Sequence, residues 1–225
     1  TTITSGSVST AGDYSDGINA FSYVGDISIT STGPVSTAGY ASDGIDTFAY
    51  YGDITIANSG AVTTVGDSAT AIEAQAYGYG DITITNTAAL GTQGANSLGI
   101  DAFAEYGDVT ILGRGDVSTT GANAMGVSAV AYQNASVTTG IVTTQGANST
   151  GIRTTASNGD ASVDATSVST GGASAGGINA TASNGAVTIT TGAVTTAGAN
   201  SVGINASAGG NIGITSTGTV TTSGA

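Results

Sequence analysis

Residues Gly80–Tyr106 read GDITITNTAALGTQGANSLGIDAFAEY, and the rest of the chain repeats this phrase with variations. Clear copies are GDISITSTGPVSTAGYASDGIDTFAYY at Gly25–Tyr51, GDITIANSGAVTTVGDSATAIEAQAYGY at Gly52–Tyr79 and GDVTILGRGDVSTTGANAMGVSAVAYQ at Gly107–Gln133. Looser copies begin near Asn134, Gly159, Gly185 and Gly210. The period is 25–28 residues, so the 225-residue chain holds about 8.5 repeats. A period of this length indicates a solenoid, a propeller or an array.

Each repeat contains three short runs with the alternation of a β-strand, typified by Asp-Ile-Thr-Ile-Thr, Val-x-Thr and Gly-Ile-x-Ala-x-Ala. Gly, Asn, Asp and Ser mark the corners between the runs. Helix formers are scarce, and no apolar face recurs at helical spacing. We therefore expect an all-β chain: a parallel β-helix (β-solenoid) with three sheets, forming one domain over residues 1–225. At ~4.8 Å per coil, the rod would be about 40 Å long.

Alternation predicts which residues point inward. The columns of the three runs are Ile3, Ile29, Ile56, Ile84, Ile111, Val137, Val163, Ile189 and Ile214; then Val8, Val35, Val62, Leu90, Val117, Val142, Val168, Val194 and Val220; then Ile18, Ile45, Ile72, Ile100, Val127, Ile152, Ile178 and Ile204. A Thr follows two residues after each member of the second column, from Thr10 to Thr222. Because a buried hydroxyl needs a partner, we expect these Thr residues to form a hydrogen-bonded ladder along the stack.

The outward positions of the third run carry an aromatic and acidic stripe in the first five coils. Its members are Phe21, Tyr23, Phe48, Tyr50, Tyr77, Phe103, Tyr132, Asp46, Glu73 and Asp101. In the later coils the aromatic positions hold Ser, Thr or Gly. Three interpretations remain open: the rings stabilise the sheet by stacking, they bind a ligand, or another part of a longer protein covers them. Under the second interpretation the stripe contacts a glycan or a partner protein.

A second column follows the corner Gly of each repeat and contains Asp26, Asp53, Asp81 and Asp108. Oxygen ligands of this kind suit a divalent cation. The alternative, which we favour, is that each Asp caps amides of the turn. A further corner motif, Gly-Ala-Asn-Ser-x-Gly, places Asn96, Asn123, Asn148 and Asn200 in register. Asn tolerates the left-handed conformation and can stack its amide between coils, which predicts a turn ladder.

Composition excludes several function classes. The chain has no His, no Lys and no Cys, its two basic residues are Arg114 and Arg153, and its net charge is −13, so nothing could neutralise nucleic-acid phosphates. Thirteen of the 15 acidic residues precede Val117. No signal peptide or apolar run long enough for a transmembrane helix is visible. The chain begins and ends within a repeat and has no polar cap, so we expect it to be a segment of a longer repeat protein.

The sequence favours a non-catalytic protein without a cofactor, because it offers no basic side chain or thiol of the kind that catalysis uses. Carboxylate pairs that could serve glycoside hydrolysis are Asp43/Asp46, Asp13/Asp16 and Asp101/Glu105, all inside the repeat and none on an inserted loop. Outward pairs of Thr residues such as Thr83/Thr85 resemble the Thr arrays of ice-binding solenoids. Ala57, Leu112 and Asp164 interrupt the array in this chain, which argues against ice binding.

The order GDITIT, V-x-T and G-A-N-S-x-G-I-x-A resembles the passenger repeats of large bacterial autotransporters and related filamentous adhesins, over essentially the whole chain. The resemblance implies a right-handed parallel β-helix exported from a Gram-negative cell, with an outer-membrane translocator elsewhere in the full protein. We therefore expect an extracellular or cell-surface rod that presents the stripe to a protein or glycan of a host or neighbouring cell. The alternative is a fibre subunit whose stripe or open ends contact another copy of the chain.

Overall fold

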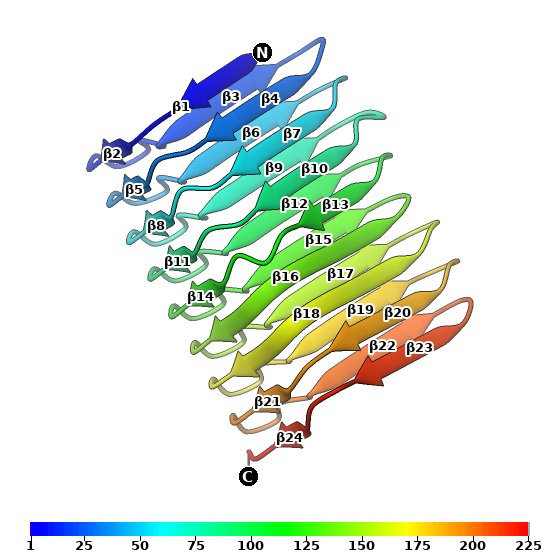
Figure 1. Ribbon diagram of the computed structural model, residues 1–225. Helices are drawn as coiled ribbons and strands as arrows, with labels where there is room; N and C mark the ends of the chain where they lie inside the picture. The colour runs from blue at the N-terminus through cyan, green and yellow to red at the C-terminus, as the bar shows by residue number, and fades with distance from the viewer. Residues whose placement is uncertain (225) are drawn as a thin grey trace.

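The computed structural model describes residues 1–224, which wind into about eight parallel coils stacked along one axis (Figure 1). Every regular element in this range is a strand, and every strand pair is parallel. The predicted all-β solenoid is thereby confirmed. The two ends of the chain lie at opposite ends of the stack (Figure 1).

The strands form three columns. The first column holds β1 (Thr2–Ser5), β4 (Ile27–Ser31), β7 (Ile54–Asn58), β10 (Ile82–Asn86), β13 (Val109–Leu112), β20 (Val187–Thr191) and β23 (Ile212–Ser216). The second holds β2 (Val8–Thr10), β5 (Val35–Thr37), β8 (Val62–Thr64), β11 (Leu90–Thr92), β14 (Val117–Thr119), β21 (Val194–Thr196) and β24 (Val220–Thr222). The third holds β3 (Ile18–Ser22), β6 (Ile45–Ala49), β9 (Ile72–Ala76), β12 (Ile100–Ala104), β15 (Val127–Ala131), β17 (Ile152–Ala156), β19 (Ile178–Ala182) and β22 (Ile204–Ala208).

The prediction of three separate sheets needs a correction. Two long strands, β16 (Ala135–Thr144) and β18 (Ala161–Thr170), run through both the first and the second column. They join these columns into one 16-stranded sheet. The third column is a separate 8-stranded sheet, which keeps the name third sheet. The length of the link between the columns does not explain the merging, because Ile3 and Val8 are as close in sequence as Val137 and Val142 and still belong to the separate strands β1 and β2.

The core follows the predicted columns. In the third sheet Ile45 pairs with Ile72, and Ile72 pairs with Ile100, so identical side chains stack directly above one another. All three are almost completely buried. Burying an Ile or Val side chain contributes about 1.5–3 kcal/mol, and the interior is filled by such residues and Ala over the whole stack. The inner face is therefore nearly uniform from one end of the rod to the other.

The Thr column is buried as expected, but its hydrogen bonds run in another direction. The hydroxyl of Thr92 donates to the carbonyl oxygen of Ser97 at 2.7 Å, and the hydroxyl of Thr144 donates to that of Ser149 at 2.7 Å. The bond thus closes the turn within each coil, and the predicted ladder between coils is wrong. The carbonyl five residues further along the chain is the acceptor within reach. Thr196 is the exception, because its buried hydroxyl has no partner among the described residues.

The Asn column of the corner motif has the predicted conformation. Asn96, Asn123, Asn148 and Asn200 have φ values of 57°, 56°, 58° and 57°. The side-chain amide of Asn123 donates to Asn96 Oδ1 and that of Asn148 donates to Asn123 Oδ1, both at 3.2 Å. The turn ladder is confirmed for Asn96, Asn123 and Asn148, whereas Asn200 follows a coil with Ser174 at this position. Two residues before Asn96, a Cβ on Gly94 would overlap the carbonyl of Gly66 in the adjacent coil, which explains the Gly at this corner.

Candidate functional site

The stripe lies on the outer face of the third sheet. Strand register places Asp46, Glu73 and Asp101 beside one another on β6, β9 and β12. The same register places Phe21 beside Phe48, and Gln75 beside Phe103. The stripe residues of the first four coils therefore form one continuous surface.

The aromatic rings stack along the Tyr column, from Tyr50 to Tyr77 at 6.4 Å, and also across from the Phe column to the Tyr column. Phe21 and Phe48 are stacked with ring centroids 5.5 Å apart, and Tyr23 and Tyr50 with centroids 5.1 Å apart. Because Gln75 occupies the next place in the Phe column, the ring of Phe48 stacks on Tyr77 instead, at 5.0 Å. Tyr77 in turn contacts Phe103 at 5.9 Å. One diagonal array of rings thus crosses from coil to coil.

Tyr132 lies outside this array. Its ring contacts Tyr106 at 5.8 Å, and Tyr106 contacts Tyr79 at 5.5 Å, so these three residues form a second line at the corner after the third sheet. Sequence analysis missed Tyr79 and Tyr106, and also Tyr51, which packs edge-on against Tyr23 and Tyr50. The signal was present, since each missed Tyr lies one to three positions after a stripe residue in the repeat.

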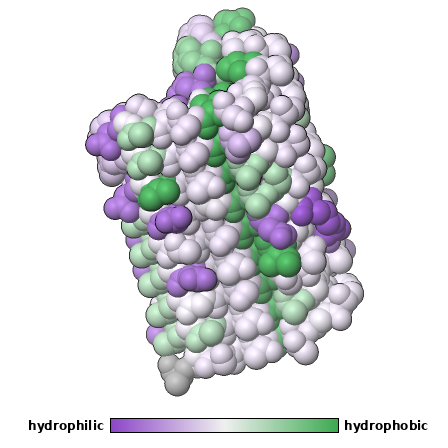
Figure 2. Space-filling model, turned by 60° about the vertical axis from the view of Figure 1, so that its left-hand side comes forward, coloured by the Kyte–Doolittle hydropathy of each residue, from purple (hydrophilic) through white to green (hydrophobic). Residues whose placement is uncertain are grey.

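The exposure of the rings decreases along the array. Phe21 and Tyr23 are 60% and 58% exposed, Tyr50 is 39% exposed, and Phe48, Tyr77 and Phe103 are half-buried. The rings therefore contact each other and also reach solvent. The face shown in Figure 2 is mostly of intermediate hydropathy, with few strongly hydrophilic residues and a narrow hydrophobic line along the rod.

The carboxylates of the stripe are crowded, and their environment raises their pKa values. Burial, with the neighbouring Glu73 carboxylate, raises the pKa of Asp43 to about 7. Burial and the Asp16 carboxylate raise the pKa of Asp46 to about 6. The pKa values of Glu73 and Asp101 are also raised, chiefly by burial. One group relieves the repulsion, because the amide of Asn19 donates to both Asp16 and Asp46, at 2.8 and 2.9 Å.

The corner Asp column caps amides. Asp26 Oδ1 accepts from the backbone N–H of Asp53 at 3.0 Å, Asp53 from that of Asp81 at 2.9 Å, and Asp81 from that of Asp108 at 2.8 Å. Each carboxylate binds the equivalent residue of the next coil, as the capping interpretation predicted. Among the described residues, no group of three or more His, Cys, Asp or Glu side chains is placed to hold a metal ion.

Two of the carboxylate pairs considered for hydrolysis have similar bonds. Asp13 Oδ1 accepts from the backbone N–H of Tyr40 at 2.8 Å, and Asp16 Oδ1 from that of Asp43 at 2.9 Å. Asp43 Oδ1 accepts from the backbone N–H of Thr70 at 2.6 Å. These carboxylates therefore take part in stacking one turn on the next.

A groove of about 490 Å³ opens on the third sheet where the stripe ends. Its apolar lining includes Tyr77, Phe103 and Met125, and its polar lining includes Asp101, Ser128 and Arg153. Register places Asp101, Ser128 and Arg153 side by side on β12, β15 and β17. Ser128 is 2% exposed, and its hydroxyl offsets part of the rise that burial causes in the pKa of Asp101. Nothing in the repeat pattern predicted this groove.

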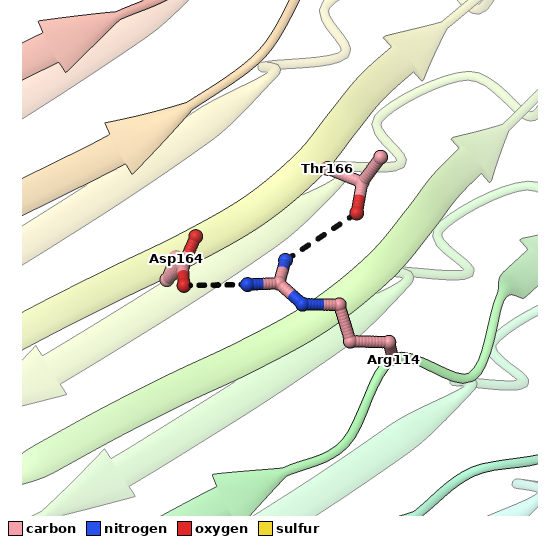
Figure 3. A network of polar contacts seen from close by, with 3 residues as sticks. All are labelled: Arg114, Asp164 and Thr166. Atoms are coloured by element: carbon pink, nitrogen blue, oxygen red, sulfur yellow. Dashed lines mark hydrogen bonds and ion pairs between the residues drawn. The ribbon is translucent and has the colours of Figure 1, made fainter.

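The two Arg side chains of the chain have different surroundings. Arg114, which lies between β13 and β14, reaches over β16 to β18, where it contacts Asp164 Oδ2 at 2.8 Å and Thr166 Oγ1 at 3.4 Å (Figure 3). Arg153 makes no ion pair, and its guanidinium makes no hydrogen bond, within residues 1–224. Arg114 links coils, whereas all the donors of Arg153 are available at the groove.

The outer face of the last coils is neutral. Beyond Arg153 the column of acidic residues continues as Asn179 and Asn205, which are linked by a side-chain hydrogen bond of 3.2 Å. The aromatic column continues as Thr155, Thr181 and Ser207. No ring and no carboxylate stands at these positions.

Within residues 1–224, no helix is long and apolar enough to cross a membrane. Comparison of the chain with protein-family models, curated proteins and solved structures finds no match in any of the three.

Proposed function

We propose that the protein is a non-catalytic structural and adhesive rod whose aromatic and acidic stripe contacts a glycan or a partner protein. The observation that carries the proposal is the diagonal array of rings from Phe21 to Phe103, which is stacked and still open to solvent. Contiguous exposed aromatic groups are rare on monomeric surfaces, and aromatic residues dominate the binding energy of interfaces.

Stacking alone is a weaker explanation of the array. The last coils have the same inner columns and the same parallel pairing without a single ring on this face. The solenoid therefore forms without aromatic stacking, and the rings are additional to what the fold needs. Their restriction to one part of one face is what a contact surface requires.

The setting of this function is a cell surface or the extracellular space. That proposal rests on the repeat pattern and its resemblance to autotransporter passengers and filamentous adhesins. The fold supports it in one respect, because a stack of parallel coils is a stiff spacer that can hold a contact surface away from its anchor.

The experiment is a binding screen of labelled rod against arrays of glycans and extracellular matrix proteins, with wild type beside Phe48→Ser/Tyr50→Ser. We expect wild type to bind a ligand and the double variant to lose that binding while keeping its fold. The matched control is Tyr14→Ser/Tyr40→Ser, which removes an exposed pair of rings in the turns before β3 and β6. Equal binding by wild type and the stripe variant would refute the proposal.

A fibre subunit is the second candidate, favoured by the high exposure of Tyr79, Phe21 and Tyr23 at 86%, 60% and 58%. Here the stripe contacts a second copy of the chain. Sedimentation velocity over a concentration series separates the candidates: association of wild type but not of Phe48→Ser/Tyr50→Ser would favour the fibre. With a net charge of −13 on each copy, such association should strengthen with salt.

A further inference from the structure

We propose that the groove between Tyr77 and Arg153 is a binding site for neutral saccharide units of a glycan chain. The inference rests on the proposed function, since it names the ligand class for the end of the stripe. Four features of the groove carry it: its charge balance, its free hydrogen-bonding groups, its aromatic wall and its dimensions.

Charge balance distinguishes the groove from the rest of the stripe. Along the acidic column, Asp46, Glu73 and Asp101 have no basic neighbour until Arg153, which lies two coils beyond Asp101. The groove is lined by this one carboxylate and this one guanidinium. The opposite charges of Asp101 and Arg153 offset each other, so the groove itself favours neither a cation nor an anion, and the net charge of −13 opposes an anion. A neutral polar ligand can use both groups without a net charge of its own.

The hydrogen-bonding groups of the groove are of both kinds. The guanidinium of Arg153 offers five N–H donors in a fixed fork and makes no bond within residues 1–224. The Asp101 carboxylate is an acceptor, and both the Ser128 hydroxyl and Arg153 favour its charged form. Sugar hydroxyls both donate and accept, so different hydroxyls of one saccharide can bond the donor fork of Arg153 and the carboxylate of Asp101, which lie two coils apart.

The aromatic wall supplies a surface for the C–H groups of a sugar ring. Tyr77 and Phe103 are half-buried, with centroids 5.9 Å apart and planes inclined at 59°. The face of an aromatic ring is electron-rich and attracts polarised hydrogens. Pyranose rings present such hydrogens on one face and hydroxyls at their edges. The arrangement of apolar wall and polar floor matches that division.

The dimensions fit a short stretch of glycan. The volume of about 490 Å³ lies within the usual range of small-molecule sites, about 300–1,000 Å³. The groove lies on the open side of the sheet between coils, so nothing in residues 1–224 closes over it. It can therefore take one or two units from within a longer chain.

The test is an NMR titration of the isotopically labelled protein with three neutral disaccharides, cellobiose, lactose and chitobiose. Glucosamine and glucuronic acid serve as charged probes. We expect saturable shifts from at least one neutral disaccharide at the amides of Gln75–Tyr77, Asp101–Phe103, Ser128–Val130 and Arg153. The amides of Gly176–Asn205, around a second groove on the same sheet, should not shift. Absence of saturable shifts with all three disaccharides, or shifts with only a charged probe, would overturn the inference.

Variants separate this inference from the proposed function. Arg153→Ala should weaken disaccharide binding at least tenfold, Arg153→Lys should restore little of it because the donor fork is lost, and Arg114→Ala should change nothing. Arg153 is exposed, so its loss should not unfold the rod. Suppose that the ligands found in the glycan and matrix-protein screen no longer bind Phe48→Ser/Tyr50→Ser but bind Arg153→Ala and Phe103→Ser normally. The groove inference then fails and the proposed function stands.

Discussion

The third sheet has two different outer faces on one continuous inner face. From β3 to β12, in the aromatic half of the rod, the outer face carries stacked rings and crowded carboxylates. From β17 to β22, in the neutral half, it carries Thr, Ser and Asn apart from Arg153 at the border. The inner column of Ile and Val passes through both parts with almost complete burial up to Ile178. The difference shows that the fold is specified by the inner columns and that the outer face is free to carry function.

The hydrogen-bonded turns offer the sharpest comparison of the two regions for stability. Thr92→Val, in the aromatic half, removes the donor to Ser97 and leaves a buried carbonyl unpaired, so we expect a loss of about 1–3 kcal/mol in the free energy of unfolding. Thr196→Val, in the neutral half, removes a buried hydroxyl that has no partner and should be neutral or stabilising. Denaturant midpoints of both variants check this, and equal losses would contradict it.

Acidic crowding should make stability depend on pH in the aromatic half. The folded-state pKa values of Asp43, about 7, and Asp46, about 6, both lie above the ordinary value of 3.8. A carboxyl whose pKa is higher in the folded chain binds its proton more tightly there, so stability should fall as the pH rises from about 4 to about 7. The melting temperature should be higher at pH 5 than at pH 8.

The double variant Asp43→Asn/Asp46→Asn is the matched control for this pH dependence. It keeps an oxygen acceptor for the Thr70 amide and removes both charges. Its melting temperature should change less between pH 5 and pH 8 than that of wild type. A wild-type rod that becomes more stable as the pH rises over this window would contradict the assignment of crowded carboxylates.

The column of Asp residues that follows the corner Gly of each repeat predicts the smallest effect on stability. Asp160 Oδ1 accepts from the Ala186 amide at 2.7 Å, but Ala186 has no acceptor to offer the next coil. Ala186→Asn should cap the Asn211 amide as Asn134 caps that of Asp160 at 2.9 Å, and raise stability by about 0.5–1 kcal/mol. Asp160→Ala should lower stability by a similar amount. Denaturation midpoints measure both effects. If Ala186→Asn brings no gain in stability, water already hydrogen-bonds the Asn211 amide as well as the new side chain would.

Most of the fold was predictable because each inward residue returns at the same phase of the repeat. The columns through Ile72 and Val62, the left-handed Asn96 turn and the Asp53 cap each follow from one residue type at one position. The direction of the Thr92 hydrogen bond was not predictable, because alternation places the hydroxyl inside without choosing between an acceptor in its own coil and one in the next. The merging of two columns at β16 was not predictable either, because links of the same length separate β1 from β2 and β20 from β21.

The candidate site was predictable in its members and not in its arrangement. Period and alternation place Phe48, Tyr50 and Tyr77 on one outer face. The diagonal path of the rings arises because Gln75 replaces a ring and leaves a space that Tyr77 fills. The groove depends on the pairing of Asp101, Ser128 and Arg153 over three coils together with Met125 from a turn, a combination that no single repeat contains.

The array screen of wild type beside Phe48→Ser/Tyr50→Ser tests the central claim, that the outer face of the aromatic half is a contact surface, most directly. We predict that wild type and Tyr14→Ser/Tyr40→Ser bind a common ligand, and that the stripe variant loses it at least tenfold while still melting cooperatively. Indistinguishable binding by all three proteins would contradict the claim and leave stacking within the sheet as the role of the rings.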